Sequence, residues 1–122
     1  MEKLNFQVES YRVRSRRESR VIFLEGVKLA HGISNKAYLR FNEGSSLPDS
    51  LGDVTNVGGL NYDGLTLNAN FHIRDFADTY KVLQTEKPVY VFSTYPSSGG
   101  EVRPLSFLEI GTYDESVGEE GT

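Results

Sequence analysis

The chain has 122 residues, a formal net charge of −4 and no cysteine. A chain of this length buries enough surface to form one domain, and the lack of cysteine excludes disulfides, thiol nucleophiles and thiolate metal sites. Because no apolar run reaches the roughly 18 residues of a membrane span, we expect a soluble, cytoplasmic protein with no membrane partner.

Charge is distributed unevenly along the chain. Residues 1–40 contain nine Lys/Arg and four Asp/Glu, whereas residues 41–122 contain four Lys/Arg and thirteen Asp/Glu. The pattern indicates a basic N-terminal segment on an acidic body.

The first predicted strand changes phase partway along its length. Apolar residues alternate with polar ones over residues 4–8, and the apolar phase then moves to Tyr11 and Val13. A one-residue shift would turn the later side chains to the wrong face. We therefore predict a β-bulge near Glu9–Ser10.

The next segments predict a hairpin and a third strand. Polar residues at Ser15–Ser19 indicate the hairpin loop, and Val21–Leu24 is apolar on both faces, as in an internal strand. This strand is expected to continue past Gly26 to about Ala30. Alternation over residues 37–41 predicts the third strand.

Residues 42–62 are rich in Gly, Ser, Asp and Pro and predict a long loop. Asp63–Gly64 is typical of a two-residue hairpin turn. We therefore expect a short strand near Val57–Tyr62 to pair with the following strand, Leu65–Ile73, in which apolar and polar residues alternate.

We predict a single domain over residues 1–113. Its last part is expected to contain one helix and two strands. Asp75 is a candidate N-cap for a helix over about residues 75–86, after which Val89–Phe92 forms a strand. A final strand covers residues 102–113, with its proline at a sheet edge or bulge. The acidic residues 114–122 predict a disordered tail.

Together these elements predict a mainly β fold with some α content, a β-rich α+β domain. We expect a small antiparallel barrel or strongly bent sheet of about five to seven strands. One short helix, about residues 75–86, lies between the central strand and the last two. This order of elements is similar to that of an OB-fold, although the strand count is higher.

The first candidate site is a basic hairpin. Guanidinium groups match phosphate and carboxylate, and a tyrosine ring can stack on a base. The same residues are also expected of a solvated hairpin that protects an edge strand, or of a surface that contacts acidic protein. The candidate residues are Tyr11, Arg12, Arg14, Arg16, Arg17 and Arg20.

The second candidate site is the polar side of the strand Leu65–Ile73. Its polar residues project from one side at intervals of about 7 Å, two strand rises. Such a row can line a ligand groove, and it is equally typical of a solvated strand. The candidate residues are Asn68, Asn70, His72 and Arg74.

Catalysis has weaker support in the sequence. His31 and His72 are the only histidines, and no second catalytic group is fixed beside either by spacing. No segment matches a calcium-binding or phosphate-binding loop. We predict no catalytic residues, no metal and no cofactor.

The expected function is therefore a non-enzymatic binding or assembly module. It contacts a protein partner, or a second copy of itself in a homo-oligomer, through the basic hairpin and the polar strand face. The acidic net charge favours protein over nucleic acid. The alternative is an OB-like nucleic-acid-binding module that uses the arginine hairpin, and a third is a small enzyme centred on His72.

Overall fold

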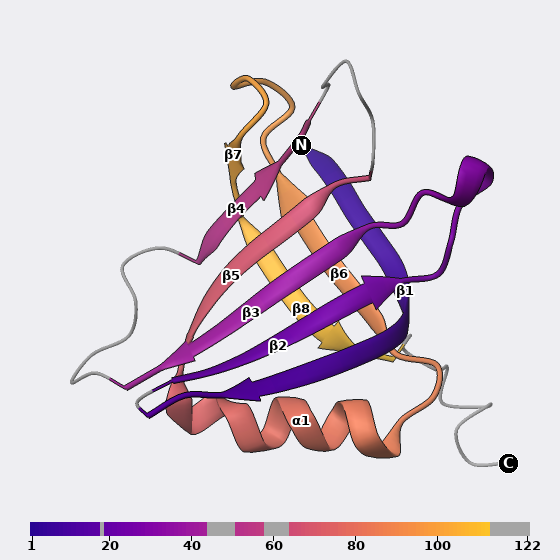
Figure 1. The fold of residues 1–122 in the computed structure, drawn as a ribbon. Helices are drawn as coiled ribbons and strands as arrows, with labels where there is room; N and C mark the ends of the chain where they lie inside the picture. Colours follow the sequence, from indigo (N-terminus) through magenta and orange to yellow (C-terminus); the bar gives the residue numbers. More distant parts are fainter. Residues whose placement is uncertain (18, 44–50, 58–63, 113–122) are drawn as a thin grey trace, which may run out of the picture.

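The computed structural model describes residues 1–17, 19–43, 51–57 and 64–112 (Figure 1). Within these residues the chain forms eight strands, two single 3-10 turns and one α-helix. In chain order they are β1 (Glu2–Ser15), β2 (Ser19–Gly26), η1 (Ala30–Gly32), β3 (Lys36–Asn42), β4 (Gly52–Thr55), β5 (Thr66–His72), η2 (Ile73–Asp75), α1 (Phe76–Thr85), β6 (Tyr90–Tyr95), β7 (Arg103–Pro104) and β8 (Phe107–Gly111).

The long strand β1 belongs to both halves of the sheet. Glu2–Gln7 pairs antiparallel with β6, and the part from Val8 to Ser15 pairs antiparallel with β2. The register shifts between Val8 and Ser10, which confirms the predicted bulge. Because a bulge bends its strand and increases the local twist, β1 turns sharply and curls the sheet around the core (Figure 1).

The strands form one sheet in the order β7-β4-β5-β3-β2-β1-β6-β8. The mainly β fold with a bent sheet and one short helix is thus confirmed. The expectation of a wholly antiparallel sheet is wrong at one pair, because β3 and β5 run parallel. The chain reverses into β4 between them, and β4 then pairs antiparallel with the far side of β5.

The predicted last strand, residues 102–113, is divided into β7 and β8. These two strands pair with β4 and β6, near opposite ends of the sheet order. Between them, the Leu105 amide donates to the Gly52 carbonyl at 2.9 Å, and the Ser106 amide donates to the Thr94 carbonyl at 2.9 Å. The segment therefore joins the two ends of the curled sheet, and the division raises the strand count above the predicted range.

The short strand that the structure pairs with β5 is β4. Of the segment predicted to do so, Val57–Tyr62, residues 58–62 lie outside the described chain, as does Asp63 of the predicted turn. One predicted strand boundary is wrong. β2 ends at Gly26, whose amide donates to the Asn35 carbonyl at 2.8 Å, and does not continue to Ala30. The predicted tail, residues 114–122, is outside the described residues as well.

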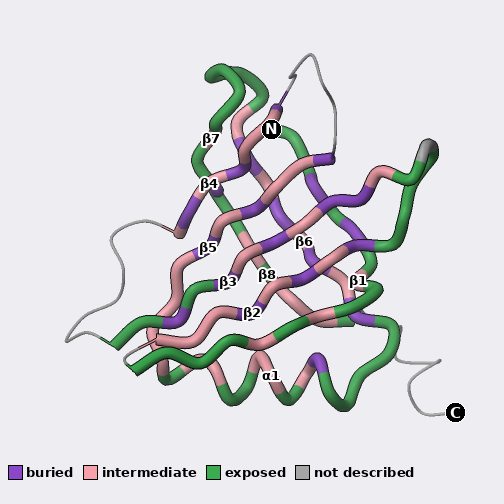
Figure 2. The backbone as a smooth tube through the Cα atoms, viewed as in Figure 1, coloured by how far each residue is buried: buried purple, intermediate pink, exposed green. Residues whose placement is uncertain are grey.

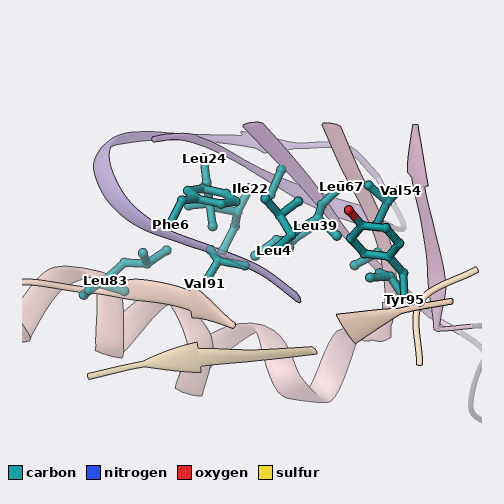
Figure 3. Packing of buried hydrophobic residues seen from close by; sticks show 14 of the residues in the cluster. Leu4, Phe6, Ile22, Leu24, Leu39, Val54, Leu67, Leu83, Val91 and Tyr95 are labelled. Carbon is teal, nitrogen blue, oxygen red and sulfur yellow. The ribbon is translucent and has the colours of Figure 1, made fainter. Parts of the chain in front are cut away.

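The core lies inside the curl of the sheet, with α1 along one side (Figure 1). Buried and less buried residues alternate along the strands (Figure 2), and the inward side chains converge (Figure 3). Ile22, Leu39 and Leu67 are fully buried there.

Helix α1 confirms the predicted helix, and it begins directly after η2. Its Leu83 is buried in the core, and its Phe76 ring packs edge-on against Phe41 with centroids 5.5 Å apart. The side chain of Asp75 makes no capping hydrogen bond. Within the described chain, no helix has the length and apolarity to cross a membrane.

Candidate binding site

A single row of side chains crosses five neighbouring strands on the outside of the sheet. Residues directly opposite one another in the strand pairing are Arg12 of β1, Phe23 of β2, Tyr38 of β3, Asn68 of β5 and Asp53 of β4. Opposite residues of neighbouring strands point to the same face and lie side by side. The row therefore leads from a cation through two aromatic rings to an amide and a carboxylate.

The aromatic half of this row is tightly associated. The centroids of the Phe23 and Tyr38 rings are 4.9 Å apart with an interplanar angle of 48°. The guanidinium carbon of Arg12 lies 4.8 Å from the Phe23 centroid. That distance is within the range of a cation–π contact, so the arginine is held beside the ring pair.

A second arginine contacts the other end of the ring pair. The guanidinium carbon of Arg40 lies 5.6 Å from the Tyr38 centroid, and its Nη1 donates to Asn68 Oδ1 at 3.4 Å. Asn68 Nδ2 in turn donates to Asp53 Oδ1 at 3.2 Å. The two rings are therefore flanked by arginines on both sides, and Asp53 ends the row.

A small residue separates the arginines in the adjacent row. Arg14 of β1, Val21 of β2 and Arg40 of β3 are opposite one another, followed by Asn70 of β5. The short Val21 side chain leaves a depression between two long arginines and the aromatic row.

This depression is a groove of about 460 Å³ on the outer face. Four of the described residues that line it are arginines and none is Asp or Glu, although the chain as a whole is acidic. We call this surface the arginine face. Its lining residues are Arg12, Arg14, Arg16, Ser19, Val21, Phe23, Tyr38, Arg40 and Asn42.

The predicted basic hairpin is only partly within this site. Arg12, Arg14 and Arg16 line the groove, whereas Arg17 is exposed in the β1–β2 turn. Arg20 Nη1 donates to the carbonyls of Arg16 and Ser19, at 3.0 and 3.2 Å, and so holds that turn.

Tyr11 lies on the opposite face of β1 from these arginines. Its ring meets Tyr80 of α1 edge-on, with centroids 6.1 Å apart, and it packs against the core. Tyr11 therefore stabilises the helix contact and is not placed to stack on a ligand at the arginine face.

The predicted polar strand face extends the same surface. Asn68 and Asn70 lie opposite Tyr38 and Arg40, and His72 lies opposite Asn42 at the end of β5. Arg74 lies beyond the strand in η2, where its backbone amide donates to His72 Nδ1 at 3.1 Å. The parallel pairing of β3 with β5 thus brings the two predicted sites together on one face.

The central residues of the arginine face were not predicted from the sequence. Phe23, Tyr38 and Arg40 join the two predicted halves. The alternation along β3 could have placed part of this set on the outer face. Tyr38, Arg40 and Asn42 alternate there with Ala37, Leu39 and Phe41, whose side chains face the core. The sequence alone does not show which strands are neighbours in the sheet.

The sheet carries a second outer surface with aromatic residues, which we call the β6 face. Tyr90 and Phe92 of β6 have ring centroids 6.0 Å apart. The adjacent hollow, about 280 Å³, includes one lysine and one glutamate among its described lining residues. These are Lys3, Asn5, Phe92, Ser93, Thr94, Phe107, Glu109 and Thr112.

Two further features concern metal binding and the third predicted function, an enzyme centred on His72. No group of three or more His, Asp or Glu side chains in that part of the chain is arranged to hold a metal ion. His72 uses Nδ1 as an acceptor for the η2 turn.

No protein-family model matches this chain, and comparison with curated proteins and with solved structures finds no significant similarity.

Proposed function

We propose that this protein is a non-enzymatic binding module that holds an anionic, polymeric partner on the arginine face. The observation that carries the proposal is the groove lined by four arginines and no carboxylate among its described residues, in a chain with net charge −4. Like charges gathered on one surface repel one another and destabilise the folded state. An anionic partner relieves that repulsion.

The chemistry of the groove limits the range of possible partners further. Guanidinium groups donate paired, fork-shaped hydrogen bonds that match carboxylate and phosphate oxygens. Arg12 and Arg14 lie on β1, and Arg16 follows directly after its end. Each is two residues from the next, so in an extended chain they span roughly 13 Å. A row of this length suits several successive charges of a polymer better than one small ion.

Two kinds of partner provide successive negative charges along a polymer. One is a protein with an acidic segment, in line with the partner expected from the sequence, and the other is a nucleic acid with its phosphates. Either partner would bind the same arginines. The proposal therefore rests on anion binding by the arginine face, which an experiment can test without knowing the natural partner.

Retention on a sulfated-polysaccharide column at low ionic strength tests the proposal. We expect the wild-type protein to bind and elute with salt, because the local charge outweighs the net charge at short range. The variant Arg12→Ala/Arg14→Ala/Arg40→Ala should pass through.

The matched control is Lys3→Ala/Lys28→Ala/Lys81→Ala, which removes the same charge from exposed positions away from the groove. It should be retained like the wild type. Wild-type protein in the flow-through, or a control that elutes as early as the arginine variant, would contradict the proposal. Thermal unfolding of each variant checks that the fold is kept.

A further inference from the structure

We propose that the polymer bound by the arginine face is single-stranded nucleic acid. Two of its bases stack on Phe23 and Tyr38 while its phosphates lie on Arg12, Arg14, Arg16 and Arg40. This inference rests on the proposed function and adds the class of ligand. It starts from the ring pair, which an anion site alone does not require.

The ring pair lies on the outside of the sheet. Phe23 and Tyr38 are half-buried, and no described element lies over this part of β2 and β3 (Figures 1 and 2). Neither ring belongs to the core cluster, which is formed instead by strand neighbours such as Ile22, Leu24 and Leu39. Two adjacent aromatic rings on an open sheet face are a platform for flat ligands.

Each nucleotide of a single strand presents a phosphate and a π-face, and the arginine face offers a partner for both. An acidic peptide would use the arginines and leave the rings unmatched. Single strands bind in this way on aromatic side chains within basic grooves, with little dependence on base identity. The face therefore fits a single strand better than a run of carboxylates.

A duplex fits the face poorly. Its bases are stacked on one another and present only their edges in the grooves, which are read by a protruding helix or two-stranded ribbon. The arginine face is a hollow in a sheet, lined by strand residues. Only unpaired bases can reach the rings.

The polar neighbours of the rings suit base edges. Asn70 and Asn42 lie on the same face, on β5 and β3. Amide side chains both donate and accept, so they can meet any base. Asp53 ends the row on the β4 side. The footprint is therefore confined to β1, β2, β3 and β5, about four nucleotides, at the low end of site sizes for single-strand-binding folds.

Fluorescence anisotropy with four labelled probes tests the inference. The probes are a 12-mer of thymidine, a 12-mer with the same number of phosphates but no bases, a 12-bp duplex and a 12-residue polyglutamate peptide. We expect the thymidine 12-mer to bind most tightly. It should exceed the abasic strand by tenfold or more, because each stacked base contributes about a factor of ten.

Variants of the ring pair separate stacking from charge. Phe23→Leu/Tyr38→Leu should reduce thymidine 12-mer binding to the level of the abasic strand and leave abasic binding unchanged. Phe23→Tyr/Tyr38→Phe keeps both rings, so it should retain the preference for bases. The matched control Tyr90→Leu/Phe92→Leu removes the ring pair of the β6 face and should bind like the wild type.

The arginine variant gives an independent readout. Arg12→Ala/Arg14→Ala/Arg40→Ala should weaken both strands alike and flatten the logarithmic salt dependence by about two, since each lost phosphate contact removes about 0.7 from the slope.

The outcomes distinguish failure of this inference from failure of the proposed function. Equal binding of the thymidine and abasic strands, or tighter binding of the duplex, overturns base stacking and leaves anion binding intact. Tighter binding of polyglutamate than of either strand also overturns the inference and identifies an acidic protein partner. If none of the four probes binds at low salt, the proposed function fails with it.

Discussion

The two faces of β1, β2, β3 and β5 are built from alternate residues of the same strands, yet they meet different requirements. On the inner face, Ile22, Leu39 and Leu67 are 0% exposed and fill the core. On the arginine face, Phe23 and Tyr38 are half-buried and have arginines on both sides. In each strand, therefore, the inner residues stabilise the fold, and the outer residues are not needed to fill the core.

This difference indicates which side chains are present for a reason other than folding. Packing of apolar side chains accounts for the inner face. The arginine face violates the usual mixing of surface charges, because four arginines gather without a carboxylate among the described lining residues. Departures from local rules are expected at functional sites.

The β6 face is a useful comparison with the arginine face, because it also carries aromatic rings. Its described lining balances Lys3 against Glu109, so it offers rings without an excess of charge. Phe107 there is 46% exposed. Aromatic exposure alone thus occurs on both surfaces, and the concentration of positive charge distinguishes the arginine face.

The largest expected effect contrasts two neighbours on β5. Leu67→Ala should lower the free energy of unfolding by about 2–5 kcal/mol, because truncation of a fully buried leucine leaves a cavity. Asn68→Ala should cost less than about 1 kcal/mol, since its hydrogen bonds lie on the outer face. Urea midpoints measure both, and equal costs would abolish the distinction between the faces.

The next effect concerns the attachment of β4, which carries Asp53 to the end of the row. Gly52 has φ +133°, and a Cβ there would overlap the Asn68 carbonyl oxygen. Gly52→Ala should therefore lower the free energy of unfolding by about 1–3 kcal/mol. The control is Gly100→Ala, at φ +87° with open space around it, which isolates the cost of the backbone conformation. Equal costs would show that the close approach of β4 is unimportant.

The sequence predicted those parts of the fold that depend on local patterns. The alternation in β5, the helix after it, the hairpin loop and the bulge in β1 are all local, and the structure confirms them. The parallel pairing of β3 with β5 depends on contacts between distant segments. So does the division of the last strand, which follows from the hydrogen bonds of Leu105 and Ser106 to Gly52 and Thr94.

The candidate site shows the same limit. The sequence identified two of its parts, the arginines of β1 and the amides of β5, but it could not place Tyr38 opposite Asn68 without the parallel register. Tyr11 is instructive, because the predicted bulge already implied that its side chain belongs to the apolar inner phase. The interaction with Tyr80 follows from that phase.

A smaller effect is expected for the rings of the arginine face. Phe23→Leu removes the ring contact with Tyr38 and the cation–π contact with Arg12. We expect the free energy of unfolding to fall by about 1–2 kcal/mol, since the aromatic pair is worth about 0.5–1.5 kcal/mol and the cation–π contact about 0.5–1 kcal/mol. Thermal or urea unfolding measures it. A cost equal to that of Leu67→Ala would assign Phe23 to the core and remove the argument that its ring is available to a ligand.

The smallest effect concerns the charge at the end of the row. Asp53 accepts a hydrogen bond from Asn68 and ends the row of opposed residues that contains the ring pair. Asp53→Asn keeps an acceptor at that position and removes a negative charge that repels phosphate. Affinity for the thymidine 12-mer should rise about twofold near 50 mM salt, and the gain should shrink at 200 mM because screening shortens the range of the repulsion. Glu109→Gln on the β6 face removes the same charge from the other outer surface and should change affinity less. An equal gain from both substitutions would mean that net charge alone governs binding, and the comparison between the two outer faces would then lose its meaning.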